Sequence, residues 1–172
     1  MSAFENESDR TLCSMAAHGD QRAFRQLVSR HENRLRSFLS RLAGAQVADD
    51  LSQEAFLKAW LGLKRFRGDC HFSSWIHSIA WRCFLDHLRR DRTEDALVEP
   101  AANERHQTEI ALEVERLLEG LTSTERAALV LCEGHGWSHS EAASILSVPL
   151  GTLKSVIRRA KEKCRSKFEP MP

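Results

Sequence analysis

Four polar side chains that could serve acid–base chemistry lie close together at the start of the segment DDLSQEAFLKAW, residues 49–60. They are Asp49, Asp50, Gln53 and Glu54. Acid–base catalysis needs a pocket and a set of partner groups, and no glycine-rich loop or nucleophile accompanies these acids. We therefore expect the chain not to be an enzyme and to need no cofactor. The acids also suit the first turns of a helix, where the helix dipole favours each by about 0.3–1 kcal/mol.

The same segment changes from polar to aromatic along its length. On a helical wheel Asp49, Gln53, Phe56 and Trp60 share one sector, so a helix here is expected to be polar at its start and buried at its end. The helix dipole does not require Gln53, whereas a protein-docking surface uses acids to select a basic partner and a packed aromatic to hold the helix rigid. The segment therefore predicts a contacting half, residues 49–54, and a supporting half, residues 56–60.

A second set of residues could hold a metal ion. Cys132, His135 and His139 have a spacing that could supply three ligands, and Cys70 with His71 could add a thiolate. Against this, Cys132 ends an apolar segment typical of a core, and the eight histidines of the chain give chance pairings. The five cysteines show no CxxC spacing, which favours reduced thiols over disulfides. A metal site is therefore only the weaker alternative.

Bases and aromatic side chains alternate between residues 64 and 82. Aromatic rings placed between basic side chains suit unstacked single-stranded nucleic acid, which needs a π-face and a phosphate-neutralising group together. Trp75 is expected in the core, and the loop 67–72 is expected to be free to contact a ligand. The residues of this group are Lys64, Arg65, Phe66, Arg67, His71, Phe72, Trp75, Trp81 and Arg82.

The C-terminal segment concentrates positive charge. Residues 150–172 hold seven bases and two acids, although the whole chain has a net charge of only +1. Bases on one helix face can neutralise phosphates, and side chains near the helix N-terminus can reach base edges in a major groove. A solvated basic helix that closes a bundle is the alternative. The inward positions are Leu150, Leu153, Ile157, Ala160 and Cys164, and the outward positions are Thr152, Lys154, Ser155, Arg158 and Arg159.

The elements that must position these groups are all helical, because apolar residues recur every three or four positions and strand patterns are nearly absent. Thr122 and Glu125 form a capping box at one helix start, and Pro149 follows a tight turn that makes the last two helices a helix-turn-helix. The remaining helices are expected over residues 21–42, 47–64, 75–90, 110–118, 138–146 and from 150 onward.

The three-and-four spacing of apolar residues stops between residues 91 and 109. This segment contains six acidic residues, two basic residues and Pro100. This is the predicted boundary between two small helical domains, 1–92 and 107–172, joined by a flexible acidic linker at 93–106. No apolar run is long enough for a signal peptide or a membrane span, so we expect a cytoplasmic protein without membrane insertion.

In three segments the sequence resembles bacterial sigma factors of the extracytoplasmic-function (ECF) type. The segments are DDLSQEAFLKAW, FRGDCHFSSWIHSIAWRCFLDHLRR and LTSTERAALVLCEGHGWSHSEAASILSVPLGTLKSVIRRAKEK, in the order of the family. The resemblance implies region 2 and region 4 domains that bind core RNA polymerase. It also implies control by an anti-sigma factor.

The resemblance carries over to individual positions. It implies that Asp49, Asp50, Gln53 and Glu54 bind the clamp helices of the largest polymerase subunit. It implies −10 contacts, with capture of a flipped base, by Lys64, Arg65, Arg67, His71, Phe72, Trp81 and Arg82. It implies that Thr152, Lys154, Ser155, Arg158 and Arg159 read the −35 duplex in a domain that also packs on the flap of the second-largest subunit.

Two positions depart from the family pattern. Trp81-Arg82 stands where the family usually has Asn, and Val156 replaces an Arg of the recognition helix. Val156 borders the expected buried face, so we expect it to pack rather than contact DNA. The promoter sequence cannot be taken over from relatives. A helix-turn-helix regulator with an N-terminal sensor domain is the alternative function.

Overall fold

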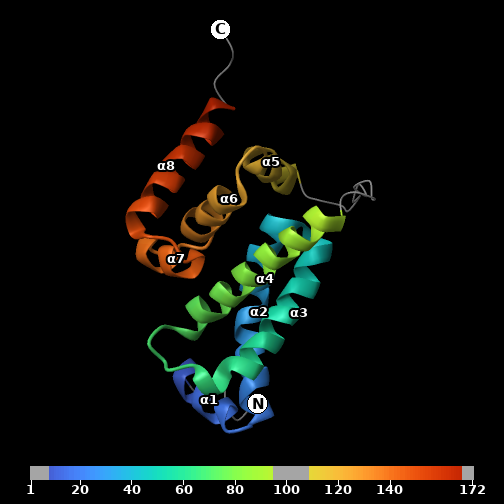
Figure 1. The fold of residues 1–172 in the computed structure, drawn as a ribbon, viewed down its shortest axis with the longest axis vertical. Coiled ribbons are helices and arrows are strands. Elements are labelled where there is room, and N and C mark those ends of the chain that lie inside the picture. Colours follow the sequence, from blue (N-terminus) through green and yellow to red (C-terminus); the bar gives the residue numbers. More distant parts are fainter. Residues whose placement is uncertain (1–7, 95–108, 168–172) are drawn as a thin grey trace. The chain divides into compact units, whose positions relative to one another are not determined.

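The computed structural model describes residues 8–94 and 109–167, and every regular element in these ranges is helical (Figure 1). The chain divides into two compact units, Met1–Phe84 and Leu85–Pro172, and each is described by itself. This division by contacts falls inside one long helix, Phe72–Glu94. Residues 95–108, which hold most of the predicted linker, lie outside the described part.

The first unit is built on two long helices that pack along each other, α2 (Gln21–Ala43) and α3 (Ala45–Gly62). Both lie close to the ranges predicted from the apolar spacing. Gly44 joins them with a positive φ of 81°, a conformation that suits glycine because it has no Cβ. The buried side of α2 includes Leu27, Leu35 and Phe38, all without exposed surface.

Two elements of this unit differ from the sequence prediction. A helix that was not predicted, α1 (Asp9–Ala17), packs on α2, and Ser8 caps it by accepting a hydrogen bond from the Thr11 amide. The third predicted helix, α4, runs Phe72–Glu94 and so begins three residues before the expected start at Trp75. A short 3-10 turn, Leu63–Arg65, follows α3.

The second unit ends in the predicted helix-turn-helix. Its helices are α5 (Glu109–Leu118), α6 (Ser123–Leu129) with a π-helical extension Val130–Gly134, α7 (His139–Leu146) and α8 (Leu150–Ser166). The turn between α7 and α8 places Ser147 at φ 56°, and the Val148 amide donates to the Ala143 carbonyl at 3.0 Å. α8 packs on both α6 and α7.

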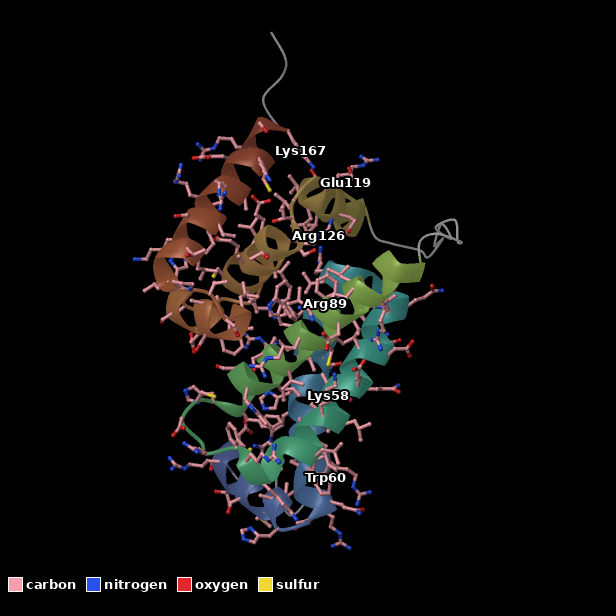
Figure 2. All side chains as sticks on the ribbon, in the orientation of Figure 1. Lys58, Trp60, Arg89, Glu119, Arg126 and Lys167 are labelled. Carbon is pink, nitrogen blue, oxygen red and sulfur yellow. The ribbon has the colours of Figure 1, made fainter. Side chains whose placement is uncertain are left out.

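Polar contacts tie the two ends of this unit together. The predicted capping box of α6 is present, with Thr122 and Glu125 bonded reciprocally. Lys163 of α8 reaches the same Glu125 carboxylate at 2.7 Å. Lys167, labelled in Figure 2, donates a hydrogen bond to the Arg116 carbonyl at 2.7 Å. This bond gives a partner to one of the last carbonyl groups of α5, which lack partners within the helix.

Glu125 should make the second unit sensitive to acid. Burial would raise the pKa of this carboxyl, but hydrogen bonds from Lys163 and Thr122 outweigh burial and hold the pKa below its ordinary value of 4.5. Because the folded pKa is the lower one, the stability from this carboxylate is present above pH 4.5 and is lost as pH falls through the folded pKa. The protection factors of α6 amides against hydrogen exchange, which correct for the slower intrinsic exchange in acid, should therefore fall below that pH.

The variant Glu125→Gln provides the comparison. Its α6 amides should have lower protection factors than those of the wild type at pH 7, because the charged bonds to Lys163 and the cap are weakened, and these factors should change less on acidification. Equal acid sensitivity of α6 exchange in both proteins would contradict this role of Glu125.

Candidate functional site

The outward face of α8 is the most regular of the candidate surfaces. All five predicted outward residues are exposed: Thr152, Lys154, Ser155, Arg158 and Arg159. Val156 is 6% exposed and packs inward as expected. Leu150 was wrongly placed in the core and is 42% exposed, because it lies in the first turn of α8, where the chain enters from the turn after α7.

The charges on this face are not equivalent. Arg158 Nη1 lies 3.0 Å from the Glu162 carboxylate one turn later, and Lys161 pairs with Glu133 of the π-helical turn at 2.7 Å. Lys154 and Arg159 form no ion pair with any residue that the structure describes. These two cations can therefore approach a phosphate without first leaving an internal partner.

The polar start of α3 divides between two sides of the helix. Asp49 pairs with Arg36 of α2 through two hydrogen bonds, and Gln53 lies beside it. Both line a hollow of about 620 Å³ between α2 and α3, together with Phe56, which is 8% exposed. The predicted sharing of one sector by Asp49, Gln53 and Phe56 is thus confirmed.

Asp50 and Glu54 lie on the adjoining side of α3. Asp50 is exposed and forms no ion pair within the described residues, whereas Glu54 pairs with Lys58 at 2.8 Å. The expectation that the helix is buried at its end is wrong on this side, because Leu57 and Leu61 are 59% and 72% exposed. We call Asp50, Glu54, Leu57 and Leu61 the α3 ridge.

Trp60, in the predicted supporting half, is only half-buried. Its ring lies 4.9 Å from that of Phe24 on α2, and both line a small hollow beside Gln21 and Arg25. The aromatic contact holds α3 against the start of α2, so Trp60 supports the helix while part of its ring remains accessible.

The basic and aromatic group around residues 64–82 separates into exposed cations and buried rings. Lys64, Arg65, Arg67, His71 and Arg82 are exposed. The two aromatic residues assigned to DNA contact are not: Phe72 is 2% exposed and Trp81 is 4% exposed. The loop 67–72 was expected to be free, but Phe72 begins α4 and turns into the core. The expectation that the Phe72 and Trp81 rings contact DNA directly is therefore wrong.

An aromatic cluster lies under this segment. The Phe66 and Trp75 ring centroids are 4.7 Å apart, and Phe72 lies 5.9 Å from Trp75. Trp75, expected in the core, is half-buried, as is Phe66. A pocket of about 420 Å³ opens between the segment 66–72 and the start of α1. Phe66 is therefore the ring most able to meet a ligand from this side.

Sequence reasoning missed the contribution of α1 to this pocket, where Ser8, Asp9, Arg10 and Cys13 form one wall. A signal was available, because Ser8 precedes a short segment in which Leu12 and Ala16 share one helix face. Both are buried against the first unit.

The metal alternative is not supported by the geometry. Within residues 8–94 and 109–167, no three His, Cys, Asp or Glu side chains come together as a ligand group, so Cys132, His135 and His139 do not form one. Burial, with a smaller contribution from Glu133, raises the pKa of the Cys132 thiol and so disfavours the thiolate that would bind zinc.

Two family models match the chain. Sigma-70 region 2 matches residues 27–94, and Sigma-70, region 4 matches residues 111–164. The first match includes α3 and the segment 64–82, and the second includes the outward face of α8. The first match also replaces the alternative of an N-terminal sensor domain. The fold and its surfaces are those of a sigma-70 type transcription initiation factor.

Relatives narrow the class. The chain is 31% identical to the ECF RNA polymerase sigma-E factor of Haemophilus influenzae over 97% of this chain and 98% of that one. It is 38% identical to the ECF RNA polymerase sigma factor SigM of Mycobacterium tuberculosis over 90% of this chain and 81% of that one. The chain belongs to the ECF sigma factors.

A solved structure supports the same fold. The sigma factor RpoE of Bartonella quintana, crystallised with the anti-sigma factor NepR, is 25% identical with a TM-score of 0.73 over 86% of this chain and 98% of that one. None of the helices in the described part of the present chain is long and apolar enough to cross a membrane.

Proposed function

We propose that this protein binds core RNA polymerase in the cytoplasm and directs it to start transcription at specific promoters. The observation that carries the proposal is the match to both sigma-70 regions together with exposed candidate surfaces on each unit. As domain limits we propose residues 1–92 for region 2, 93–106 for the linker and 107–172 for region 4.

Region 4 would read the −35 element through α8. The face formed by Thr152, Lys154, Ser155, Arg158 and Arg159 is free of apolar side chains and rich in donors for phosphates and base edges. Ser155 already donates to the Gly151 carbonyl at 3.1 Å, so its oxygen is held close to the helix. Val156 removes one basic side chain from the face.

Region 2 would bind the melted −10 strand beside the segment 64–72. Lys64, Arg65, Arg67, His71 and Arg82 would neutralise the backbone or contact bases. Phe72 and Trp81 would act by supporting this surface from within, because their rings are buried.

The α3 ridge and the neighbouring hollow would dock on the clamp helices of the largest polymerase subunit. Asp50 and Gln53 are exposed and provide the polar contacts, while Asp49 and Glu54 share their charge with Arg36 and Lys58. Leu57 and Leu61 add an exposed apolar strip, a feature typical of interaction sites. Region 4 would also pack on the flap of the second-largest subunit.

An anti-sigma factor would control the protein. The proposal is supported by the similarity to RpoE of Bartonella quintana, whose structure holds the anti-sigma factor NepR. Affinity purification of the tagged chain from native cells tests it. Recovery of the chain without any such partner, together with constitutive transcription, would count against control of this kind.

Reconstituted transcription tests the main proposal. The full chain is added to core polymerase of its own organism, and transcripts from a genomic DNA library are sequenced. We expect transcripts that begin downstream of a shared pair of promoter elements and that require both components. Duplex binding by the isolated chain without any polymerase-dependent transcript would favour the stand-alone regulator instead.

A further inference from the structure

The pocket of about 420 Å³ in the first unit has two walls of different origin. One wall is the segment 66–72, which lies within the region 2 match. The other is the start of α1, which lies before residue 27, where that match begins. α1 therefore adds side chains to this pocket that the family match does not cover.

α1 is fixed in place at the pocket. Asp9 accepts hydrogen bonds from Arg30 at 3.0 Å and from His31 at 2.7 Å, both on α2. The His31 ring in turn lies 5.2 Å from Phe72, a pocket residue. Leu12, one turn later, is fully buried. The wall is thus anchored by long-range contacts and can hold a side chain in a defined position.

Arg10 is the cation that this wall contributes. It is exposed and forms no ion pair with any described residue, while its neighbour Asp9 is bonded to Arg30 and His31. Its Nε lies 4.0 Å from the point where a Cβ at Gly68 would be, so the side chain reaches across to the opposite wall. Its fork of N–H groups remains available for a ligand.

The pocket holds an aromatic ring and a cation, the two groups that suit an unstacked nucleotide, beside the carboxylates of Asp9 and Asp69. Phe66 offers a half-buried ring for stacking, and Arg10 offers planar donors for a base edge or a phosphate. Its volume falls within the range of roughly 300–1,000 Å³ found for small-ligand sites. Gly68, at φ 74°, lets the second wall turn close to Arg10 without a side chain between them.

We propose that Arg10 is a specificity-determining residue for single-stranded promoter DNA. In this arrangement its guanidinium closes the α1 side of the pocket and contacts the base that stacks on Phe66. The N-terminal helix then takes part in reading the −10 element, and Asp9 acts as a positioning residue through Arg30 and His31. This inference rests on the sigma-factor function proposed above.

Transcription from a promoter library randomised across the −10 element tests the inference. The full chain with core polymerase is compared with Arg10→Ala and with Arg22→Ala, an exposed arginine on α2 outside the pocket. We expect Arg10→Ala to lower the preference at one −10 position about tenfold, the size of one lost base contact, and to leave the −35 preference unchanged. Both variants should melt like the wild type.

The outcomes separate the inference from the function on which it rests. If the wild type selects no promoter, the proposed function fails. If the wild type selects a −10 motif and Arg10→Ala selects the same motif with equal strength, the role of Arg10 is overturned.

Cys70 gives a second readout, because it is exposed and lines the same pocket. Alkylation by iodoacetamide is followed by mass spectrometry in the holoenzyme, with and without a DNA fork that carries the selected −10 strand. Bound DNA should slow modification of Cys70 severalfold in the wild type and less in Arg10→Ala. An unchanged rate in the wild-type complex would show that the strand does not enter the pocket.

Discussion

Replacing Asp50 with alanine should weaken binding to core RNA polymerase at least about tenfold, or about 1.4 kcal/mol, without unfolding the protein. Asp50 is exposed on the α3 ridge and forms no ion pair within the described residues, so its charge is available to a basic partner. Titration of core polymerase with the labelled protein at two salt concentrations measures the effect, which should shrink at the higher one.

Two variants on the same helix serve as controls. Glu54→Ala should have a smaller effect on affinity, because Glu54 shares its charge with Lys58 at 2.8 Å. Phe56→Ala should instead lower the free energy of unfolding by about 3–5 kcal/mol, because the ring is almost fully buried. Equal core affinity of Asp50→Ala and the wild type would refute the docking role of the α3 ridge.

Local patterns predicted the second unit well. The capping box at Thr122 and Glu125, the turn before Pro149 and the three-and-four spacing of α8 are each set by residues a few positions apart. The outward face of α8 could be predicted in the same way, because burial of Leu153 and Ile157 places the basic side chains on the opposite, exposed side of the helix.

The first unit depended more on contacts that a sequence pattern does not contain. The fully buried residues of α3 are the small Ala48, Ala55 and Ala59, whereas the larger Leu57 and Leu61 remain exposed. Hydrophobicity alone does not predict that alanines are buried while leucines of the same helix face solvent. The helix α1 was missed because a nine-residue segment is marginal alone, and it is held by the contacts of Asp9 with α2.

The site residues followed the same division. The cations near residues 64–82 were correctly expected at the surface, because charged side chains are rarely buried without a partner. Aromatic side chains carry no such constraint. The sequence alone does not show whether Phe72 and Trp81 stack on a nucleobase or fill the core. In the structure both rings are buried by packing around α4.

Replacing Arg159 with alanine should weaken promoter binding more than replacing Arg158. Arg158 is partly neutralised by Glu162 at 3.0 Å, whereas Arg159 forms no ion pair with described residues and gives its full charge to the duplex. A lost phosphate contact should weaken binding about equally across promoter sequences and reduce the slope of log affinity against log salt by about 1. Holoenzyme binding to one promoter over a series of salt concentrations measures both quantities.

Neighbouring residues on α8 provide the controls. Glu162→Gln should strengthen promoter binding, because it removes a negative charge and frees Arg158. Lys161→Ala should change affinity least, because Lys161 is paired with Glu133 at 2.7 Å and lies outside the predicted contact face. A salt slope in Arg159→Ala equal to that of the wild type would mean that this arginine does not meet a phosphate, and the −35 role of the α8 face would then have to rest on Lys154 and Thr152.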